Sequence, residues 1–224
     1  FTTVNEIIRV KNAGGNYFWH LYTIPIKEKV RQMKDVISLW EVTGYKNPKL
    51  PSWDDTNELH WLYQHAKDYQ SIVEVGSWKG AGIHALASGC PGHVTAVENF
   101  SFTLPHGLPE AFAIPMTVTG QNGDAVEKEF LHNVKDLANV TLIKKSSLEA
   151  AEQFKDGSIA MVYLDACHEY ADVAKDVMAW LPKCNKMLAG HDFDHPEVKK
   201  ALYDLGVKPV SAWEKSRIWY VVKE

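Results

Sequence analysis

Short apolar runs alternate with helical patterns along the chain from residue 71 onward. Between the runs, apolar residues recur at the three- and four-residue spacing of an amphipathic helix, as at Val126, Phe130 and Val134. Strands that alternate with helices form βαβ units, and these units pair in a parallel sheet. The sequence therefore predicts an α/β fold with a doubly wound, mostly parallel sheet. The strands are expected at residues 72–75, 94–97, 140–143, 159–164 and 187–190.

The end of the chain does not follow this alternation of strands and helices. Residues 207–210 and 218–222 are both β-prone, and the polar segment at residues 214–216 leaves no room for a helix between them. Two strands with so short a connection must run antiparallel, because a parallel pair needs a crossover of about a dozen residues or more. We therefore expect the sheet to end in a closing antiparallel hairpin.

The first fifty residues carry a different pattern. Apolar residues recur at helical spacing between Lys27 and Trp40, which predicts an amphipathic helix there. We therefore expect an N-terminal helical extension over residues 1–50, followed by the main domain over residues 51–224. The aromatic side chains at residues 17–22 are compatible with an acceptor pocket, with a core and with dimer contacts.

Composition disfavours several classes of protein. The formal charge of −4 argues against a nucleic-acid partner, because neutralising phosphates needs a basic excess. No stretch approaches about 18 consecutive apolar residues, so we expect no membrane span. Cys90, Cys167 and Cys184 lack the spacing of a zinc site or a disulfide framework, which favours a reducing, cytoplasmic compartment. The expected partner is a small molecule, and a homo-oligomer stays open.

A glycine-rich turn follows the first predicted strand. Gly76 and Gly80 let the backbone turn sharply and let a ligand approach the main chain, while the next helix points its N-terminal amides at that ligand. Alone, this signal is weak, because a tight strand-to-helix turn without a ligand also uses such glycines. Glu98, at the end of the second predicted strand and 22 positions after Gly76, has the place of a carboxylate that accepts hydrogen bonds from both ribose hydroxyls. Together the two features predict a nucleoside-containing cofactor.

Further polar residues follow the third, fourth and fifth predicted strands. Ser147, after the third, is compatible both with capping a helix and with facing an adenine edge. Asp165 and Asp192 end the fourth and fifth strands, where an oxygen-preferring divalent metal could bridge them. His168 is a candidate general base, because its unperturbed pKa lies near neutrality. His191 and His195 are interpreted as structural, as is Cys167.

Three motifs carry a resemblance to a known family. The run from Ile72 to Gly80 resembles the first-strand motif of class I S-adenosylmethionine-dependent methyltransferases, in a bacterial branch with E-V-G-S-x-x-G at this place. The same branch has D-x-x-H-x-Y after the fourth strand and G-H-D-F after the fifth, which match residues 165–170 and 190–193 here. Trp78 replaces the middle glycine of the commoner pattern. The resemblance covers about residues 58–192.

The resemblance implies a seven-stranded, Rossmann-like methyltransferase sheet whose last strand is inserted beside the fifth. It implies that Glu98 holds the ribose of S-adenosylmethionine, that Ser147 lies by the adenine, and that a divalent cation such as Mg²⁺ binds Asp165 and Asp192. The full set of cofactor-binding residues that follows is Glu74, Gly76, Ser77, Gly80, Glu98, Ser147 and Asp165.

The predicted function is S-adenosylmethionine-dependent methylation of oxygen in a small hydroxylated acceptor, such as a sugar or secondary metabolite. His168 and Asp165 are the candidate catalytic residues. An NAD-type oxidoreductase is an alternative, but Gly76, Gly80 and Gly82 do not have the G-x-G-x-x-G spacing, and the closing hairpin also disfavours it. A non-catalytic module that binds the cofactor is a further alternative.

Overall fold

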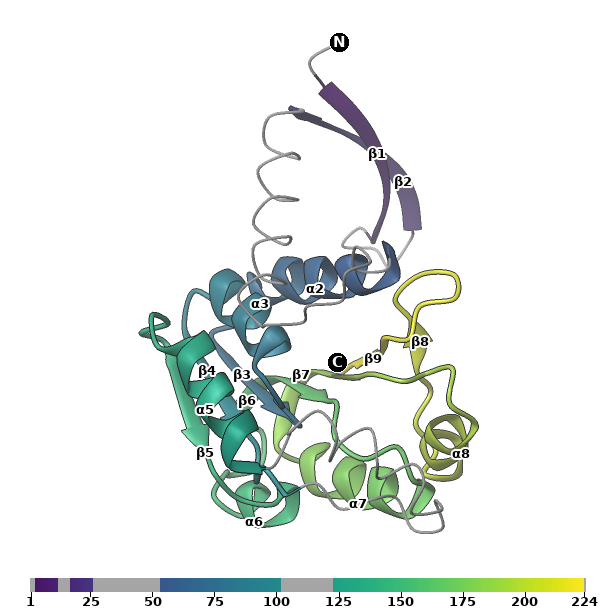
Figure 1. Ribbon diagram of the computed structural model, residues 1–224. Helices are drawn as coiled ribbons and strands as arrows, with labels where there is room; N and C mark the ends of the chain where they lie inside the picture. Colours follow the sequence, from purple (N-terminus) through teal and green to yellow (C-terminus); the bar gives the residue numbers. More distant parts are fainter. Residues whose placement is uncertain (1–2, 12–16, 26–52, 102–122, 224) are drawn as a thin grey trace. The chain divides into compact units, whose positions relative to one another are not determined.

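The computed structural model describes residues 3–11, 17–25, 53–101 and 123–223 (Figure 1). The chain divides into two compact units, Phe1–Ser38 and Leu39–Glu224. None of the helices in the described residues is long and apolar enough to cross a membrane.

The described part of the smaller unit is an antiparallel hairpin. Strand β1 (Thr3–Lys11) pairs with β2 (Tyr17–Pro25), in a register that runs from Thr3 opposite Pro25 to Lys11 opposite Tyr17. The predicted helical extension over residues 1–50 is therefore wrong for these two segments. Both are rich in β-branched and aromatic residues, which favour an extended backbone. The helix predicted between Lys27 and Trp40 lies outside the described residues, as does the domain boundary at residue 50.

The larger unit is built on a seven-stranded sheet with the order β5-β4-β3-β6-β7-β9-β8. Neighbouring strands from β5 through β7 are parallel, β9 is antiparallel to β7, and β8 is antiparallel to β9. The last strand is thus inserted beside the fifth strand of the parallel set, and the predicted fold class is confirmed. The strands are β3 (Ser71–Val75), β4 (His93–Val97), β5 (Val140–Ile143), β6 (Ile159–Leu164), β7 (Cys184–Gly190), β8 (Val210–Ser211) and β9 (Trp219–Val222).

Helices cover both faces of this sheet (Figure 1). On one face α3 packs against α2 and α5, and on the other face α7 packs against α6 and α8. The inner strands are consequently buried on both sides, which explains why they read as continuous apolar runs rather than as alternating patterns. Bounds are α2 (Trp53–Ala66), α3 (Ala81–Gly89), α5 (Gly123–Val134), α6 (Ser147–Ala151), α7 (Tyr170–Trp180) and α8 (Pro196–Asp204).

Large side chains fill the layer between the sheet and α6, α7 and α8. Trp180 of α7 and Leu202 of α8 are fully buried, and they belong to one core cluster with Val162 and Leu188 of the central strands. Trp219 of β9 lies in the same cluster, so the closing hairpin is part of this core. Burying a side chain of this size contributes roughly 1.5–3 kcal/mol, so this face fixes the position of α7 relative to the strand ends.

The chain order reverses between β3 and β6. Successive strands β4 and β5 extend the sheet on one side of β3, whereas β6 and β7 extend it on the other. In open α/β sheets a crevice forms at the carboxyl ends of the strands at such a switch point. Gly76 ends β3 there with a φ of 89°, and a Cβ on it would lie 2.1 Å from the carbonyl oxygen of Asp165, which follows β6. The two strand ends therefore meet through bare backbone.

Replacing Gly76 with Ala should destabilise the protein by more than about 2 kcal/mol, because the added Cβ meets backbone and the left-handed conformation is itself strained. Gly157→Ala is the matched control, because Gly157 is also left-handed, with a φ of 65°, but has no atom within 4 Å of the added Cβ. Urea unfolding of the two variants measures the difference. Equal losses of stability would contradict the close approach at Gly76.

Candidate active site

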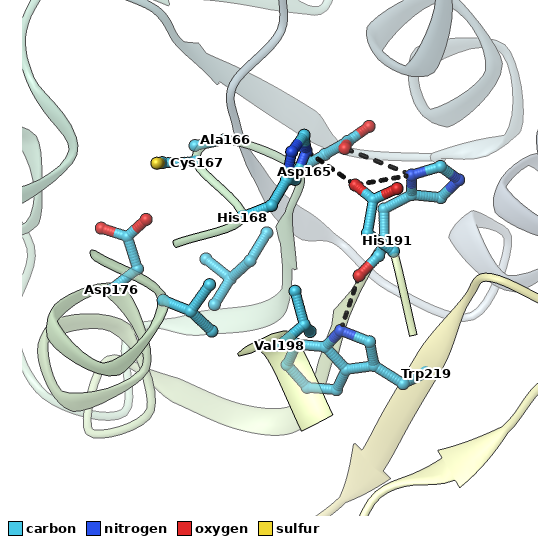
Figure 2. Close-up of a pocket in the computed structure, with 11 residues that line it drawn as sticks. Asp165, Ala166, Cys167, His168, Asp176, His191, Val198 and Trp219 are labelled. Carbon is cyan, nitrogen blue, oxygen red and sulfur yellow. Dashed lines mark hydrogen bonds and ion pairs between the residues drawn. The ribbon is translucent and has the colours of Figure 1, made fainter. Parts of the chain in front are cut away.

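A cleft of about 890 Å³ opens at the carboxyl ends of the parallel strands. Asp165 and His168 also line a smaller adjoining pocket that includes Asp192 (Figure 2). Glu74, Ser77 and Gly80, also predicted to bind the cofactor, are not among the described residues that line the cleft. The predicted residues that line it are Gly76, Glu98, Ser147, Asp165 and His168.

The glycine-rich turn is supported from beneath by a buried carboxylate. Glu74 is 2% exposed, and a Cβ on Gly82 would lie 1.9 Å from its Oε1 atom. Burial, together with the nearby Asp165 carboxylate, raises the pKa of Glu74 well above its usual value. Hydrogen bonds with the Ser77 side chain and the Ile83 backbone partly counteract this rise. Glu74 and Ser77 thus shape the turn from below, while Gly80, with a φ of 89°, leads into α3.

Glu98 is held in place by backbone amides from two turns. The N–H of Trp78 donates to its Oε2 at 2.9 Å, and the N–H of Phe100 donates to its Oε1 at 2.8 Å. Trp78 and Phe100 have φ values of 42° and 56°, so both turns adopt a conformation that side chains other than Gly rarely take. Each carboxylate oxygen keeps lone-pair capacity for another donor. The structure therefore presents a fixed, bidentate acceptor in the cleft.

The sequence left two roles open for Ser147, and the structure assigns the helix-capping role to its neighbour Ser146. Ser146 is the N-cap of α6, in a capping box with Glu149. Ser147 instead lines the cleft and donates its hydroxyl proton to Asp176 Oδ1 at 2.5 Å. The indole N–H of Trp180 donates to the same hydroxyl oxygen at 2.9 Å.

Asp176 is a cleft residue that sequence reasoning missed. It lies on α7, is 8% exposed, and lines both the cleft and the smaller pocket. Burial raises its pKa to about 6, against a lowering effect of the hydrogen bond from Ser147. Its position in the sequence could have indicated it. Asp176 lies on the apolar face of α7 between Val173 and Trp180, where burying a carboxylate has a large desolvation cost.

The smaller pocket contains a cluster of ion pairs at the ends of β6 and β7 (Figure 2). His168 Nε2 lies 2.7 Å from Asp192 Oδ2. His191 Nδ1 lies 3.2 Å from the same oxygen and 3.5 Å from Asp165 Oδ1. Asp165, His168 and Asp192 each offer one ligand atom, and these atoms all lie within 4.8 Å of one another. The structure thus brings together the three residues that the sequence assigned to catalysis and metal binding.

His191 joins this cluster to α2 and to the closing hairpin. Its Nε2 lies 2.9 Å from Glu58 Oε2, and Arg217 Nη2 donates to that same oxygen at 3.1 Å. The indole N–H of Trp219 donates to the His191 carbonyl at 3.0 Å. Sequence reasoning missed Glu58, which is 133 residues from His191 in the chain, and it interpreted His191 as structural. Glu58 is buried in α2, and its local sequence carries no signal of this distant partner.

The charges in this cluster are mutually dependent. Burial opposes ionisation of Asp192, but hydrogen bonds from His168 and His191 prevail and lower the pKa of its carboxyl. The hydrogen bond to Asp192 raises the pKa of His168. Burial disfavours a charged His191, yet its bonds to Asp192 and Glu58 raise its pKa. Burial raises the pKa of Asp165, with a counteracting effect of His191. Asp192 is consequently an ionised carboxylate between two imidazoles.

Comparison with known families identifies the class of protein. A family model described as a methyltransferase domain matches residues 73–193, which is more than half of the chain, so the chain belongs to this family. A curated relative, the uncharacterised protein y4gI of Sinorhizobium fredii, is 27% identical over 124 residues. That match covers 55% of this chain but only 13% of the relative's own length.

Solved structures share the fold at low sequence identity. The O-methyltransferase NovP matches with a TM-score of 0.62 at 12% identity, covering 88% of this chain and 98% of that one. The SAH-bound Podospora anserina methyltransferase PaMTH1 matches with a TM-score of 0.55 at 12% identity, over 88% and 94% of the two chains. A Bacillus cereus O-methyltransferase in complex with SAH matches at 0.52 and 12%, over 86% and 91%. The sheet is therefore that of the Rossmann-like methyltransferases.

The raised pKa of Asp176 predicts a pH-dependent stability. The folded carboxyl holds its proton up to about pH 6, whereas the unfolded one loses it near the ordinary aspartate pKa of 3.8, so stability is lost as the pH rises between these values. We compare the free energy of unfolding of the wild type with that of Asp176→Asn. The wild-type value should fall relative to the variant by up to roughly 3 kcal/mol as the pH rises from about 4 to about 6. Chemical unfolding at several pH values measures it. The exposed Asp136→Asn variant is the control, and a pH-independent difference for Asp176→Asn would contradict the raised pKa.

Proposed function

We propose that this chain binds S-adenosylmethionine in the cleft and transfers its methyl group to an oxygen of a small hydroxylated acceptor, such as a sugar or secondary metabolite. The observation that carries the proposal is Glu98, a carboxylate fixed by two backbone amides beside the glycine turn. Membership of the methyltransferase-domain family supports it, as do fold neighbours named as O-methyltransferases and as complexes with SAH.

The residues present fit this cofactor. Glu98 can accept hydrogen bonds from the two ribose hydroxyls, one on each oxygen. Gly76 leaves bare backbone at the strand end, where the aminoacyl part of the cofactor can lie against the main chain. The cleft volume of about 890 Å³ is in the range of small-molecule and cofactor sites. We assign Ser147 and Asp165 to direct contact as well, and Glu74, Ser77 and Gly80 to the shape of the turn. The cofactor would supply a methyl group on an electrophilic sulfonium.

His168 is the proposed general base. Its Nε2 is engaged by Asp192, so its Nδ1 is the atom that takes the proton from the acceptor hydroxyl, and Asp192 stabilises the imidazolium that results. The His168 side chain is about half exposed, which leaves it within reach of an acceptor. The step then balances: the acceptor O–H bond breaks and its proton goes to His168 Nδ1, an O–CH₃ bond forms, and the sulfur–CH₃ bond of the cofactor would break to leave S-adenosylhomocysteine.

The Asp165, His168 and Asp192 cluster also fits a divalent cation such as Mg²⁺. Two carboxylate oxygens and one imidazole nitrogen lie close enough together to share an ion. A bound cation would lower the pKa of the acceptor hydroxyl. In that case Asp165 and Asp192 would hold the ion, and His168 would either join them or act as the base.

We propose a small-molecule acceptor as the partner, with neither nucleic acid nor membrane, and we leave a homo-oligomer open. All three cysteines are free thiols, which supports a reducing, cytoplasmic compartment.

Calorimetry with S-adenosylhomocysteine tests cofactor binding. Glu98→Gln should weaken binding by roughly 10-fold or more, because an amide offers only one acceptor oxygen and no charge. Glu197→Gln, on α8 and absent from the cleft lining, should bind like the wild type. Tight binding of NAD without binding of S-adenosylhomocysteine would favour the oxidoreductase instead.

A methyl-transfer screen over phenols, catechols and sugars tests the reaction. We expect turnover by the wild type and a loss of roughly 100-fold or more for Asp165→Asn and for His168→Ala. Removing divalent cations with a chelator and then adding Mg²⁺ distinguishes a metal site from a His168 base paired with Asp192. Activity that is lost and restored assigns the cluster to a metal, and activity that persists assigns it to the His168–Asp192 pair. Unchanged turnover by Asp165→Asn would remove that residue from the mechanism.

A further inference from the structure

Asp176 is a buried carboxylate that the proposed chemistry does not use. It is 8% exposed, lies on α7, and lines the cleft. Figure 2 shows its carboxylate on the side of Cys167, apart from the ion pairs that His191 makes with Asp165. It is therefore separate from the candidate metal and base cluster. A carboxylate buried to this extent needs hydrogen-bond donors to offset its lost hydration.

The hydrogen bonds around Asp176 have a fixed direction. The indole N–H of Trp180 can only donate, so the Ser147 oxygen accepts from it at 2.9 Å. The Ser147 hydroxyl proton is then free to point at Asp176 Oδ1, 2.5 Å away. Among the described residues, Oδ2 of Asp176 makes no hydrogen bond of its own. One oxygen is thus satisfied by the protein, and the other remains an acceptor at the cleft wall.

The ligand that completes this site must carry a hydrogen-bond donor. Glu98 presents its acceptors after β4, whereas Ser147 and Asp176 present theirs from the side of α6 and α7. If the ribose is bound at Glu98, the base of the nucleoside extends to one side of it. Adenine has one donor group on its edge, the exocyclic 6-amino group.

We propose that Asp176 recognises the adenine of the cofactor by accepting a hydrogen bond from its 6-amino group through Oδ2. This inference rests on the proposed S-adenosylmethionine site and adds its base specificity. Besides its own place in the cleft lining, Ser147 holds the Asp176 carboxylate in the orientation that leaves Oδ2 toward the cleft.

Binding of two ligands to the wild-type protein is the first test. S-inosylhomocysteine carries a carbonyl oxygen in place of the 6-amino group of S-adenosylhomocysteine and a proton on N1, so at position 6 it sets an acceptor against the carboxylate. The wild type should bind the adenosyl compound roughly 10- to 100-fold more tightly, because the inosyl compound turns its carbonyl oxygen, an acceptor, toward Oδ2 and loses the hydrogen bond. Calorimetry of both ligands measures the ratio.

The Asp176→Asn variant should reverse this preference. The Ser147 hydroxyl fixes the amide oxygen toward itself, so the amide NH₂ takes the place of Oδ2 and becomes a donor to the cleft. The inosyl ligand should gain affinity and the adenosyl ligand should lose it, each by roughly 10-fold. Glu197→Gln, on α8 and absent from the cleft lining, also removes one negative charge and should keep the wild-type ratio. Thermal unfolding checks that both variants are folded.

The outcomes separate the inference from the function on which it rests. Equal affinity of the wild type for the two ligands, or an unchanged ratio in folded Asp176→Asn, would overturn the role of Asp176 while leaving the cofactor site intact. Failure of the wild type to bind S-adenosylhomocysteine would overturn the proposed cofactor, and the inference with it.

Discussion

The contact between the ends of β3 and β6 is the constraint on which the rest of the site depends. A Cβ at Gly76 would lie 2.1 Å from the carbonyl oxygen of Asp165, so the two chains approach as closely as bare backbone allows. The Asp165 N–H donates to the Val75 carbonyl at 2.8 Å, which locks the same pair of strand ends. This close approach occurs where the strand order reverses, and it places the Asp165 carboxylate near both Glu74 and the neighbouring cleft. A side chain at position 76 would push β6 away and separate those groups.

Bringing several carboxylates close together has an electrostatic cost. The cost is met by different charge partners at different positions, and the pKa values shift accordingly. Glu74 is buried without a counter-charge, so its pKa rises. Asp192 has two imidazoles, and its pKa falls although it is also partly buried. Glu58 has His191 and Arg217, and their attraction lowers its pKa against the effect of burial. Desolvation penalises an isolated charge far more than a paired one, so the paired carboxylates remain ionised and the solitary one tends to be protonated.

The strands and strand-end residues could be predicted from the sequence because their signals are local. A strand buried on both faces is a continuous apolar run, and polar residues directly after it must lie at the carboxyl edge, which located Glu98, Asp165 and Asp192. Glu58 and Asp176 could not be found in this way, because their partners come from distant segments and from a different helix. The N-terminal hairpin was missed for another reason. The helical spacing begins only after Lys27 and gives no information on residues 3–25, whose own composition favours strands.

Asp165 lies at the boundary between two chemically different halves of the site. The cleft half, with Glu98 and Ser147, offers hydrogen-bond acceptors held by backbone amides and by α7, which suits a ligand rich in donors. The other half, with His168 and Asp192, offers a charged pair that can take up a proton or hold a cation. Asp165 lines both pockets. Under the proposed function, a cofactor bound at Glu98 and an acceptor within reach of His168 would meet beside Asp165, as an in-line transfer between two bound molecules requires. The same backbone contact that excludes a side chain at Gly76 thus also holds Asp165 between the two halves.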